Sequence, residues 1–217
     1  MTDNIHATIF IGSLKDDSSD SNTANLAKIV SRELKKYKVS VTLRYLANRH
    51  MAHGVDFKTD DPDDQAEVYF EDIHKSDILI LATPIWWGIQ SSLCQQWMER
   101  VGAYDDQYIT TGKSPLYNKV FGCIVTGSND GFQHIHGNFY NFASELGMTI
   151  PPEAHVDWGT ILGKIDNEQT MNQVKNASRN LFLWSKMIKS LDLGNVALSI
   201  KPGRVGITSQ DKLAKSK

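Results

Sequence analysis

The segment ILILATP, residues 78–84, is the feature that most restricts the fold of this chain. It is apolar at nearly every position and shows no alternation of apolar and polar residues. A strand with one face in water alternates, whereas a strand covered on both faces of a parallel sheet stays apolar throughout. The segment therefore predicts a central parallel strand with helices on both sides.

Short β-rich runs and longer helical patterns alternate along the chain, which is typical of a doubly wound α/β sheet. Four further strands are predicted at residues 6–12, 39–46, 119–127 and within 148–159. Helices are predicted at residues 22–37, 63–77, 91–102, 132–147 and 172–191. No internal repeat or linker is present, so we expect one domain over residues 1–191 and a flexible C-terminal extension over residues 192–217.

The composition excludes several classes of partner. The 217 residues are 41% hydrophobic and 22% charged, with a formal net charge of −2. A basic footprint for nucleic acid or a membrane surface is missing, so we expect neither partner. No apolar run approaches the ~20 residues of a membrane span, and a signal-peptide pattern is missing, so we expect a cytoplasmic protein. Cys94 and Cys123 stand in apolar surroundings and are expected to be reduced core residues.

The loop GSLKDDSSDSNT, residues 12–23, is rich in hydroxyl and amide groups and precedes a predicted helix. A helix N-terminus presents unpaired backbone N–H groups and the positive end of the helix dipole to an anion. Five side chains of the loop suit a phosphate: Ser13, Lys15, Ser21, Asn22 and Thr23. The alternative is an ordinary loop in which Ser21 or Asn22 only caps the helix.

Two more loops follow predicted strands at the same edge of the sheet. In TPIWWG, residues 83–88, the adjacent Trp86 and Trp87 suit a flat ring that covers them, and Gly88 permits close approach. In TGSNDG, residues 126–131, backbone N–H groups can reach the edge of such a ring. Taken singly, the tryptophans could pack in a core or interface, and the last loop could be a polar turn. The hypothesis of a ligand site rests on all three loops lying at one edge.

Several known site patterns are missing. The first loop lacks the G-x-x-x-x-G-K-[ST] pattern of nucleoside-triphosphate sites and the G-x-G-x-x-G pattern of dinucleotide sites. The central strand ends in Thr83 and Pro84, without the aspartate of a response regulator. His50 and His53 have the spacing of a ligand pair, but no third ligand has a defined spacing, so we expect no metal site.

With these residues in view, the chain resembles the flavodoxin-like NAD(P)H-dependent FMN reductases, particularly the multimeric flavodoxins. The resemblance covers nearly the whole length and is carried by GSLK…SNTANLA, DILILATPIWWGIQSSLCQQWMER and VTGSNDGFQH…ELGMTIPPEAHVDW. It implies a flavodoxin-like, doubly wound, five-stranded parallel sheet of order 2-1-3-4-5 with helices on both faces. An iron–sulfur cluster, which some relatives carry, is excluded because the loop after the second strand has no cysteine.

The resemblance also implies an FMN site made of three groups of residues. The phosphate would be surrounded by Ser13, Lys15, Ser21, Asn22 and Thr23. The isoalloxazine ring would be lined by Pro84, Ile85, Trp86, Trp87 and Gly88. Its pyrimidine side would be approached by Thr126, Gly127, Asn129, Asp130 and Gly131. The first loop also carries three aspartates, which disfavour a phosphate unless they point away: Asp16, Asp17 and Asp20.

The activity implied by the resemblance is an FMN-dependent NAD(P)H oxidoreductase that passes electrons from NADH or NADPH to a small acceptor such as a quinone or flavin. The cofactor carries the hydride chemistry, so we expect no catalytic residue in the protein. Candidates for substrate contact are Tyr104, Tyr108, His134 and His136. The resemblance favours a homodimer or homotetramer. Two alternatives stay open: a one-electron flavodoxin-type carrier, and an interaction module that has lost FMN.

Overall fold

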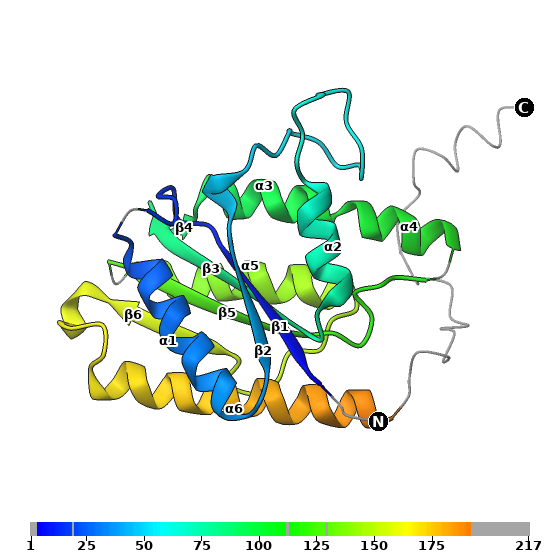
Figure 1. The fold of residues 1–217 in the computed structure, drawn as a ribbon. Helices are drawn as coiled ribbons and strands as arrows, with labels where there is room; N and C mark the ends of the chain where they lie inside the picture. Colours follow the sequence, from blue (N-terminus) through cyan, green and yellow to red (C-terminus); the bar gives the residue numbers. More distant parts are fainter. Residues whose placement is uncertain (1–3, 19, 112, 129, 192–217) are drawn as a thin grey trace, which may run out of the picture.

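The structure is a computed structural model in which residues 4–18, 20–111, 113–128 and 130–191 are described. The predicted C-terminal extension, residues 192–217, lies outside the described residues. The strands are β1 (His6–Ile11), β2 (Ser40–Tyr45), β3 (Ile78–Trp86), β4 (Ile89–Gln90), β5 (Val120–Gly127) and β6 (His155–Gly159) (Figure 1). The α-helices are α1 (Asn22–Lys36), α2 (Glu67–Lys75), α3 (Ser92–Val101), α4 (Ala103–Thr111), α5 (Phe132–Glu145) and α6 (Glu168–Ser190). Two 3-10 helices are η1 (Leu46–Asn48) and η2 (Thr160–Leu162).

Five strands form a parallel sheet in the order β2-β1-β3-β5-β6. This order confirms the predicted doubly wound sheet, because β5 and β6 are the fourth and fifth of its parallel strands. The short β4 pairs antiparallel with the end of β3. Ile80, in the middle of β3, stands opposite Ile9 of β1 and Gly122 of β5. The strand predicted to be central is therefore central.

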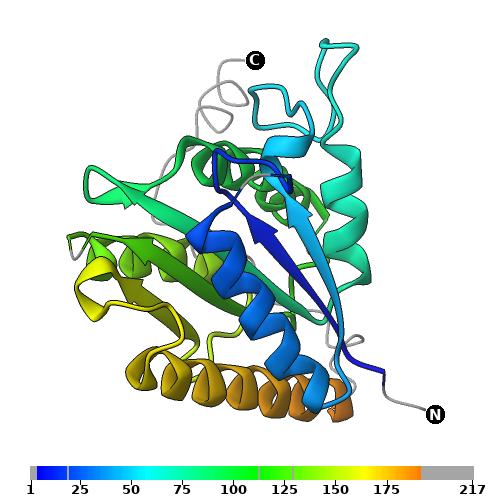
Figure 2. The same ribbon diagram turned by 60° about the vertical axis from the view of Figure 1, so that its left-hand side comes forward.

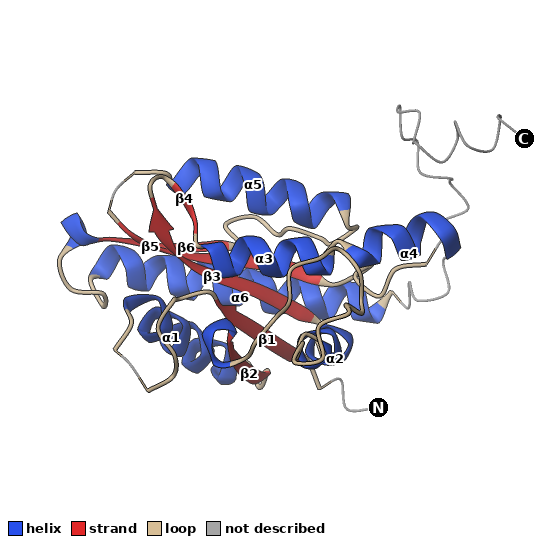
Figure 3. Ribbon diagram, turned by 90° about the horizontal axis from the view of Figure 1, so that it is seen from above, coloured by secondary structure: helices blue, strands red, loops and turns tan. Residues whose placement is uncertain are grey.

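Two layers of helices cover the sheet, as Figure 3 shows from above. On one face, Leu79 and Leu81 pack in a core with residues of α2, α3 and α5. On the other face, Ile78 and Ile80 pack in a core with residues of α1 and α6, which lie together in Figures 1 and 2. Both faces of β3 are buried, which explains why its sequence does not alternate.

Three features differ from the predicted elements. The helix α4 has only Ala103 and Tyr104 buried and no marked apolar stripe, so its sequence carries little helical signal. The strand β4 is two residues long, which is too short to recognise from a pattern. Helix α2 begins at Glu67 instead of residue 63, because the Asp64 carboxylate accepts the backbone N–H of Ala66 at 3.1 Å and holds a turn there.

None of the described helices is long and apolar enough to cross a membrane.

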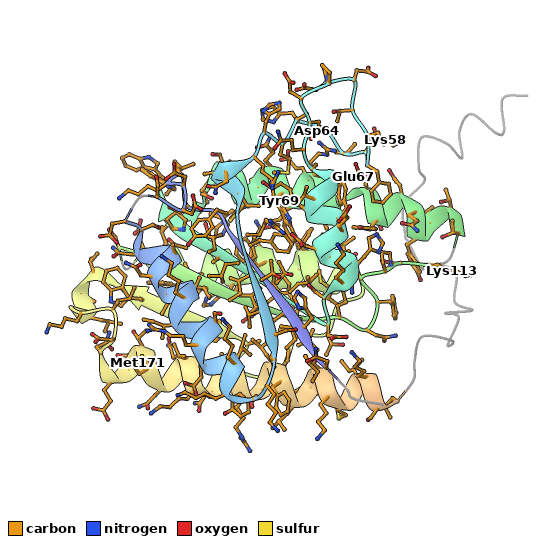
Figure 4. All side chains as sticks on the ribbon, in the orientation of Figure 1. Lys58, Asp64, Glu67, Tyr69, Lys113 and Met171 are labelled. Atoms are coloured by element: carbon orange, nitrogen blue, oxygen red, sulfur yellow. The ribbon has the colours of Figure 1, made fainter. Side chains whose placement is uncertain are left out.

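The long loop between η1 and α2 is fixed to the domain by Arg100 of α3. This side chain is 1% exposed, and its guanidinium donates to the Asp64 carboxylate at 2.7 Å. It also donates to three backbone carbonyls of the loop, those of Ala52, Asp56 and Phe57. Figure 4 shows Asp64 where the loop returns to α2. Burial alone would raise the pKa of Asp64, but hydrogen bonds from Arg100 and from backbone N–H groups hold it below its usual value.

We predict that Arg100→Met lowers the free energy of unfolding by about 3–5 kcal/mol, because it leaves a carboxylate that is only 10% exposed without its cation. Urea unfolding measures this loss. The control is Arg32→Met, since Arg32 is exposed on α1 and its loss should change stability by less than ~0.5 kcal/mol. A loss below about 1 kcal/mol for Arg100→Met would contradict the assigned role.

The Arg100–Asp64 pair also determines the direction in which stability changes with pH. Because the pKa of Asp64 is lowered from 3.8 on folding, its contribution to stability is complete above that pH and is lost as the pH falls below it. Arg100→Met removes the cation that lowers this pKa. The stability of the Arg100→Met variant should therefore fall less steeply than that of the native chain as the pH is lowered.

Candidate functional site

The three loops singled out in the sequence follow β1, β3 and β5, which are neighbours in the sheet. The strand order reverses between β1 and β3, since β2 lies on one side of β1 and all later parallel strands lie on the other. Ligands of open α/β sheets bind at the carboxyl ends of the strands at such a reversal. In Figure 2 the hairpin of β3 and β4 reaches out at this edge, and the loop after β5 lies beneath it.

Buried hydroxyl groups connect the first loop to the start of α1. Ser21 is the N-cap of α1, and its Oγ accepts the backbone N–H of Ala24 at 3.3 Å. The same hydroxyl donates to Ser13 Oγ at 2.9 Å. Thr23 Oγ1 lies 2.6 Å from Thr126 Oγ1 at the end of β5, so a hydrogen bond joins the first and third loops. Ser21 therefore caps α1, as the alternative of an ordinary loop predicted. Its hydroxyl is also part of a polar cluster with Ser13.

The N-terminus of α1 has the properties of an anion site. Within the described part of the chain, the backbone N–H groups of Asn22 and Thr23 meet no acceptor. The first turn of α1 carries no acidic residue, so nothing in that turn opposes the positive end of the dipole. A negatively charged group at this point would accept both N–H groups.

Three polar side chains of the first loop have defined partners: Lys15, Asp16 and Asp20. Asp16 Oδ1 accepts from Ser18 Oγ at 2.7 Å. Asp20 Oδ1 accepts from Asn25 Nδ2 at 2.9 Å, and its backbone oxygen accepts from Lys15 Nζ at 2.7 Å. The carboxylates of Asp16 and Asp20 are thus engaged within the loop and its helix.

The second loop is the tip of a β-hairpin, because β3 continues two residues beyond its predicted end at Pro84 and pairs with β4. Pro84, Ile85 and Trp86 are the last residues of β3, and Trp86 pairs with Ile89 of β4. Trp87 and Gly88 form the two-residue turn with φ of 51° and 79°, as a type I′ turn requires. The exposed fractions of Trp86 and Trp87 are 49% and 94%. The tryptophans are therefore surface residues in this chain and not part of its core.

The third loop packs tightly against the hairpin. Gly131 has a φ of 92° and starts α5 as its N-cap. A Cβ at this position would lie 2.4 Å from the carbonyl oxygen of Gly88, which no real contact allows. A Cβ on Gly127 would likewise lie 2.9 Å from Cβ of Ile85. Only glycines permit this approach of the two backbones.

Most of the predicted site residues thus come from segments that touch one another. Asn22 and Asp130 are exposed at this edge, and Asn129 lies outside the described residues. Two of the substrate-contact candidates belong elsewhere: Tyr104 is buried against His74 at 3.1 Å, and Tyr108 stacks on Tyr117. Both tyrosines lie on α4 and pack against its neighbours.

Two residues at the base of the hairpin were not among the predicted site residues. The buried Thr83 Oγ1 accepts the backbone N–H of Ser91 at 2.9 Å. Ser91 Oγ caps α3 and donates to the carbonyl oxygen of Gly12 at 2.6 Å, which links the first loop to α3. The only signal in the sequence was the predicted start of a helix at residue 91.

The strand order and the two layers of helices define a class of protein, the flavodoxin-like α/β proteins. The chain matches the model of one family, described as NADPH-dependent FMN reductase, over residues 5–161. It belongs to that family.

Individual relatives agree with this assignment. The chain is 34% identical over 112 residues to 8-demethyl-8-aminoriboflavin-5′-phosphate synthase of Streptomyces davaonensis, which covers 48% of this chain and 44% of that protein. A crystal structure of RosB with the bound intermediate 8-demethyl-8-formylriboflavin-5′-phosphate has a TM-score of 0.77 and 23% identity, covering 98% of this chain and 86% of that one. A solved flavone reductase has a TM-score of 0.64 and 17% identity, covering 85% of this chain and 64% of that one. The two solved structures share the fold of this chain.

The segment matched in the Streptomyces davaonensis synthase spans 44% of that protein's length. Family membership and fold therefore apply to the chain directly. Its activity, substrates and partners do not follow from a match of that length.

We predict that Gly131→Ala lowers the free energy of unfolding by about 1–3 kcal/mol, because the added Cβ meets Gly88 and the backbone is left-handed. The control is Gly137→Ala in the same helix, where nothing lies within 4 Å of the new Cβ. That control should be neutral or stabilising by up to about 1 kcal/mol. Equal effects of the two substitutions in thermal unfolding would refute the close packing of the loops.

Proposed function

We propose that the chain binds FMN at this edge and acts as an NAD(P)H-dependent oxidoreductase that reduces a small acceptor such as a quinone or flavin. One observation carries the proposal: three loops with a phosphate-type polar cluster and an exposed aromatic hairpin are tied together at the reversal point of the sheet. The proposed contacts are Ser13, Lys15, Ser21, Asn22, Thr23, Pro84, Ile85, Trp86, Trp87, Gly88, Thr126, Gly127, Asn129, Asp130 and Gly131.

The donor groups of the first loop fit a phosphate. The backbone N–H groups of Asn22 and Thr23 lack acceptors in the described chain, and the hydroxyls of Ser13 and Ser21 lie beside them. The helix dipole adds about 0.3–1 kcal/mol for an anion at this position. Lys15 contributes a single point charge and not the two-pronged contact of an arginine, so the backbone N–H groups provide most of the recognition.

The hairpin suits a flat, largely apolar ring. Trp86, Trp87 and Ile89 are all about half exposed or more, which leaves a contiguous apolar surface on a protruding turn. A ring stacked on one of these indoles gains about 0.5–1.5 kcal/mol beyond the area that it buries. The tight contact between Gly88 and Gly131 fixes the hairpin against the third loop, so the ring would meet a hairpin whose position is already set.

The protein contributes binding and orientation, because bound FMN supplies the hydride chemistry. Burial raises the pKa of the Cys94 thiol to about 11 and raises the pKa of Cys123 as well. Both thiols are therefore protonated at neutral pH and do not act as nucleophiles. The role of the chain's residues is to hold the phosphate at α1 and to present one face of the ring beside the exposed hairpin. The same apolar hairpin is the surface through which we propose that two or four copies associate.

The experiment uses the purified full chain, loaded with FMN and desalted, then mixed with NADPH or NADH without oxygen. We expect the flavin absorbance to be retained and then to bleach promptly, and addition of a benzoquinone should restore it and support continuous NAD(P)H oxidation. Retained flavin that bleaches only with dithionite would identify a one-electron carrier. No retained flavin would overturn the FMN site itself.

Two variants locate the ring. Trp87→Ala should weaken FMN binding about 2- to 10-fold, since it removes an aromatic contact. The control is Ile161→Ala in η2, because Ile161 is also exposed (78%) but follows β6. The control should leave FMN affinity unchanged. Neither substitution should alter the stability of the apo chain by more than ~0.5 kcal/mol.

A further inference from the structure

A second polar cluster lies between α5 and β6, apart from the proposed FMN contacts. His136 Nε2 lies 2.9 Å from Asp157 Oδ1, and the ring centroids of His136 and His155 are 4.5 Å apart. Tyr140 Oη lies 3.1 Å from His155 Nδ1. All four side chains are half-buried. Two imidazoles, a carboxylate and a phenol thus share one small, partly open space.

The secondary structure explains why these side chains meet. His136 and Tyr140 are four residues apart on α5 and therefore lie on the same face of the helix. His155 and Asp157 are two residues apart on β6 and therefore lie on the same face of the strand. The packing of α5 against this part of the sheet brings the two pairs together, although their positions in the sequence show no metal-binding pattern.

We propose that His136, His155 and Asp157 bind a divalent transition-metal ion of the Zn²⁺ type. One ligand atom from each residue lies within 4.8 Å of the others, and the His136–Asp157 pair is already at 2.9 Å. A tetrahedral ion with bonds of about 2.0–2.1 Å separates its ligand atoms by roughly 3.3 Å, so only a small movement of His155 is needed. Three protein ligands leave the fourth position for water or a small ligand.

The donor set of the cluster suits a metal ion of this type. Imidazole nitrogens are among the commonest metal ligands in proteins, and a carboxylate oxygen completes the set. One divalent ion would use both imidazole rings and the carboxylate together.

The surrounding residues provide a second shell. Tyr140 Oη lies 3.1 Å from His155 Nδ1 and can orient that ring. The backbone N–H of Asp157 donates to Gln173 Oε1 at 2.8 Å, which fixes the strand at the ligand. The ion would join α5 to β6 two residues before the end of the strand, where Gly159 stands opposite Gly127.

The test titrates the full chain, with any tag removed, with ZnCl2 and separately with MgCl2. We expect one Zn²⁺ per chain by calorimetry, and no binding of Mg²⁺, which prefers oxygen ligands. At 100 times the dissociation constant, Zn²⁺ should raise the melting temperature by about 5–10 °C. Co²⁺ should give the intense visible bands of a tetrahedral site. The experiment needs no FMN, so its result is independent of the proposed activity.

Matched variants decide whether the cluster is the site. His155→Gln and His136→Gln should each weaken Zn²⁺ binding by more than ~100-fold, since even second-shell changes cost 10- to 100-fold. His134→Gln, an exposed histidine on the same helix, should bind as the native chain does. Far-UV circular dichroism establishes that each variant is folded. Absence of stoichiometric Zn²⁺ binding, or native affinity in both His136→Gln and His155→Gln, would overturn the proposal.

Discussion

The parallel pairing of β3 with β1 on one side and β5 on the other is the constraint on which the rest of the structure depends. Because the three strands run in the same direction, the loops that follow them end at one edge of the sheet. The hydrogen bond between Thr23 and Thr126 then joins the first and third loops, and the contact of Gly131 with Gly88 joins the second and third. The sheet therefore fixes the geometry of the proposed cofactor site before any ligand binds.

The parts of this arrangement that depend on local sequence could be predicted. The uninterrupted apolar run of β3 reflects burial on both faces, with Leu79 facing one core and Ile80 the other. The predicted helix start at residue 91 and helix end at residue 147 also follow from local backbone chemistry, since Ser91 caps α3 and Gly147 has a left-handed φ of 80° after α5. The family resemblance added the strand order, which the structure confirms.

The contacts that build the sites could not be predicted, because they join residues that are distant in the sequence. Thr23 and Thr126 are 103 positions apart, and neither position carries a signal for the other. Arg100 of α3 pairs with Asp64, which lies 36 positions earlier in the loop before α2, and the sequence does not link the two. The left-handed φ of Trp87 opposes the intrinsic preference of a bulky residue and is imposed by the hairpin. His136 of α5 and His155 of β6 are likewise distant in the sequence, so they form no recognisable metal-binding pattern there.

The central claim is that the start of α1 binds the phosphate of FMN, and Asn22→Asp tests it most directly. Asn22 is exposed at the first position of α1, and the substitution keeps its shape, suits the helix dipole and adds one negative charge. The measurement is the affinity of the variant for FMN and for riboflavin, which lacks the phosphate, with Asn172→Asp on α6 as the control. The account predicts that FMN binding weakens by about 10-fold or more through charge repulsion, while riboflavin binding and the control stay unchanged. Unchanged FMN affinity, or an equal loss for FMN and riboflavin, would contradict it.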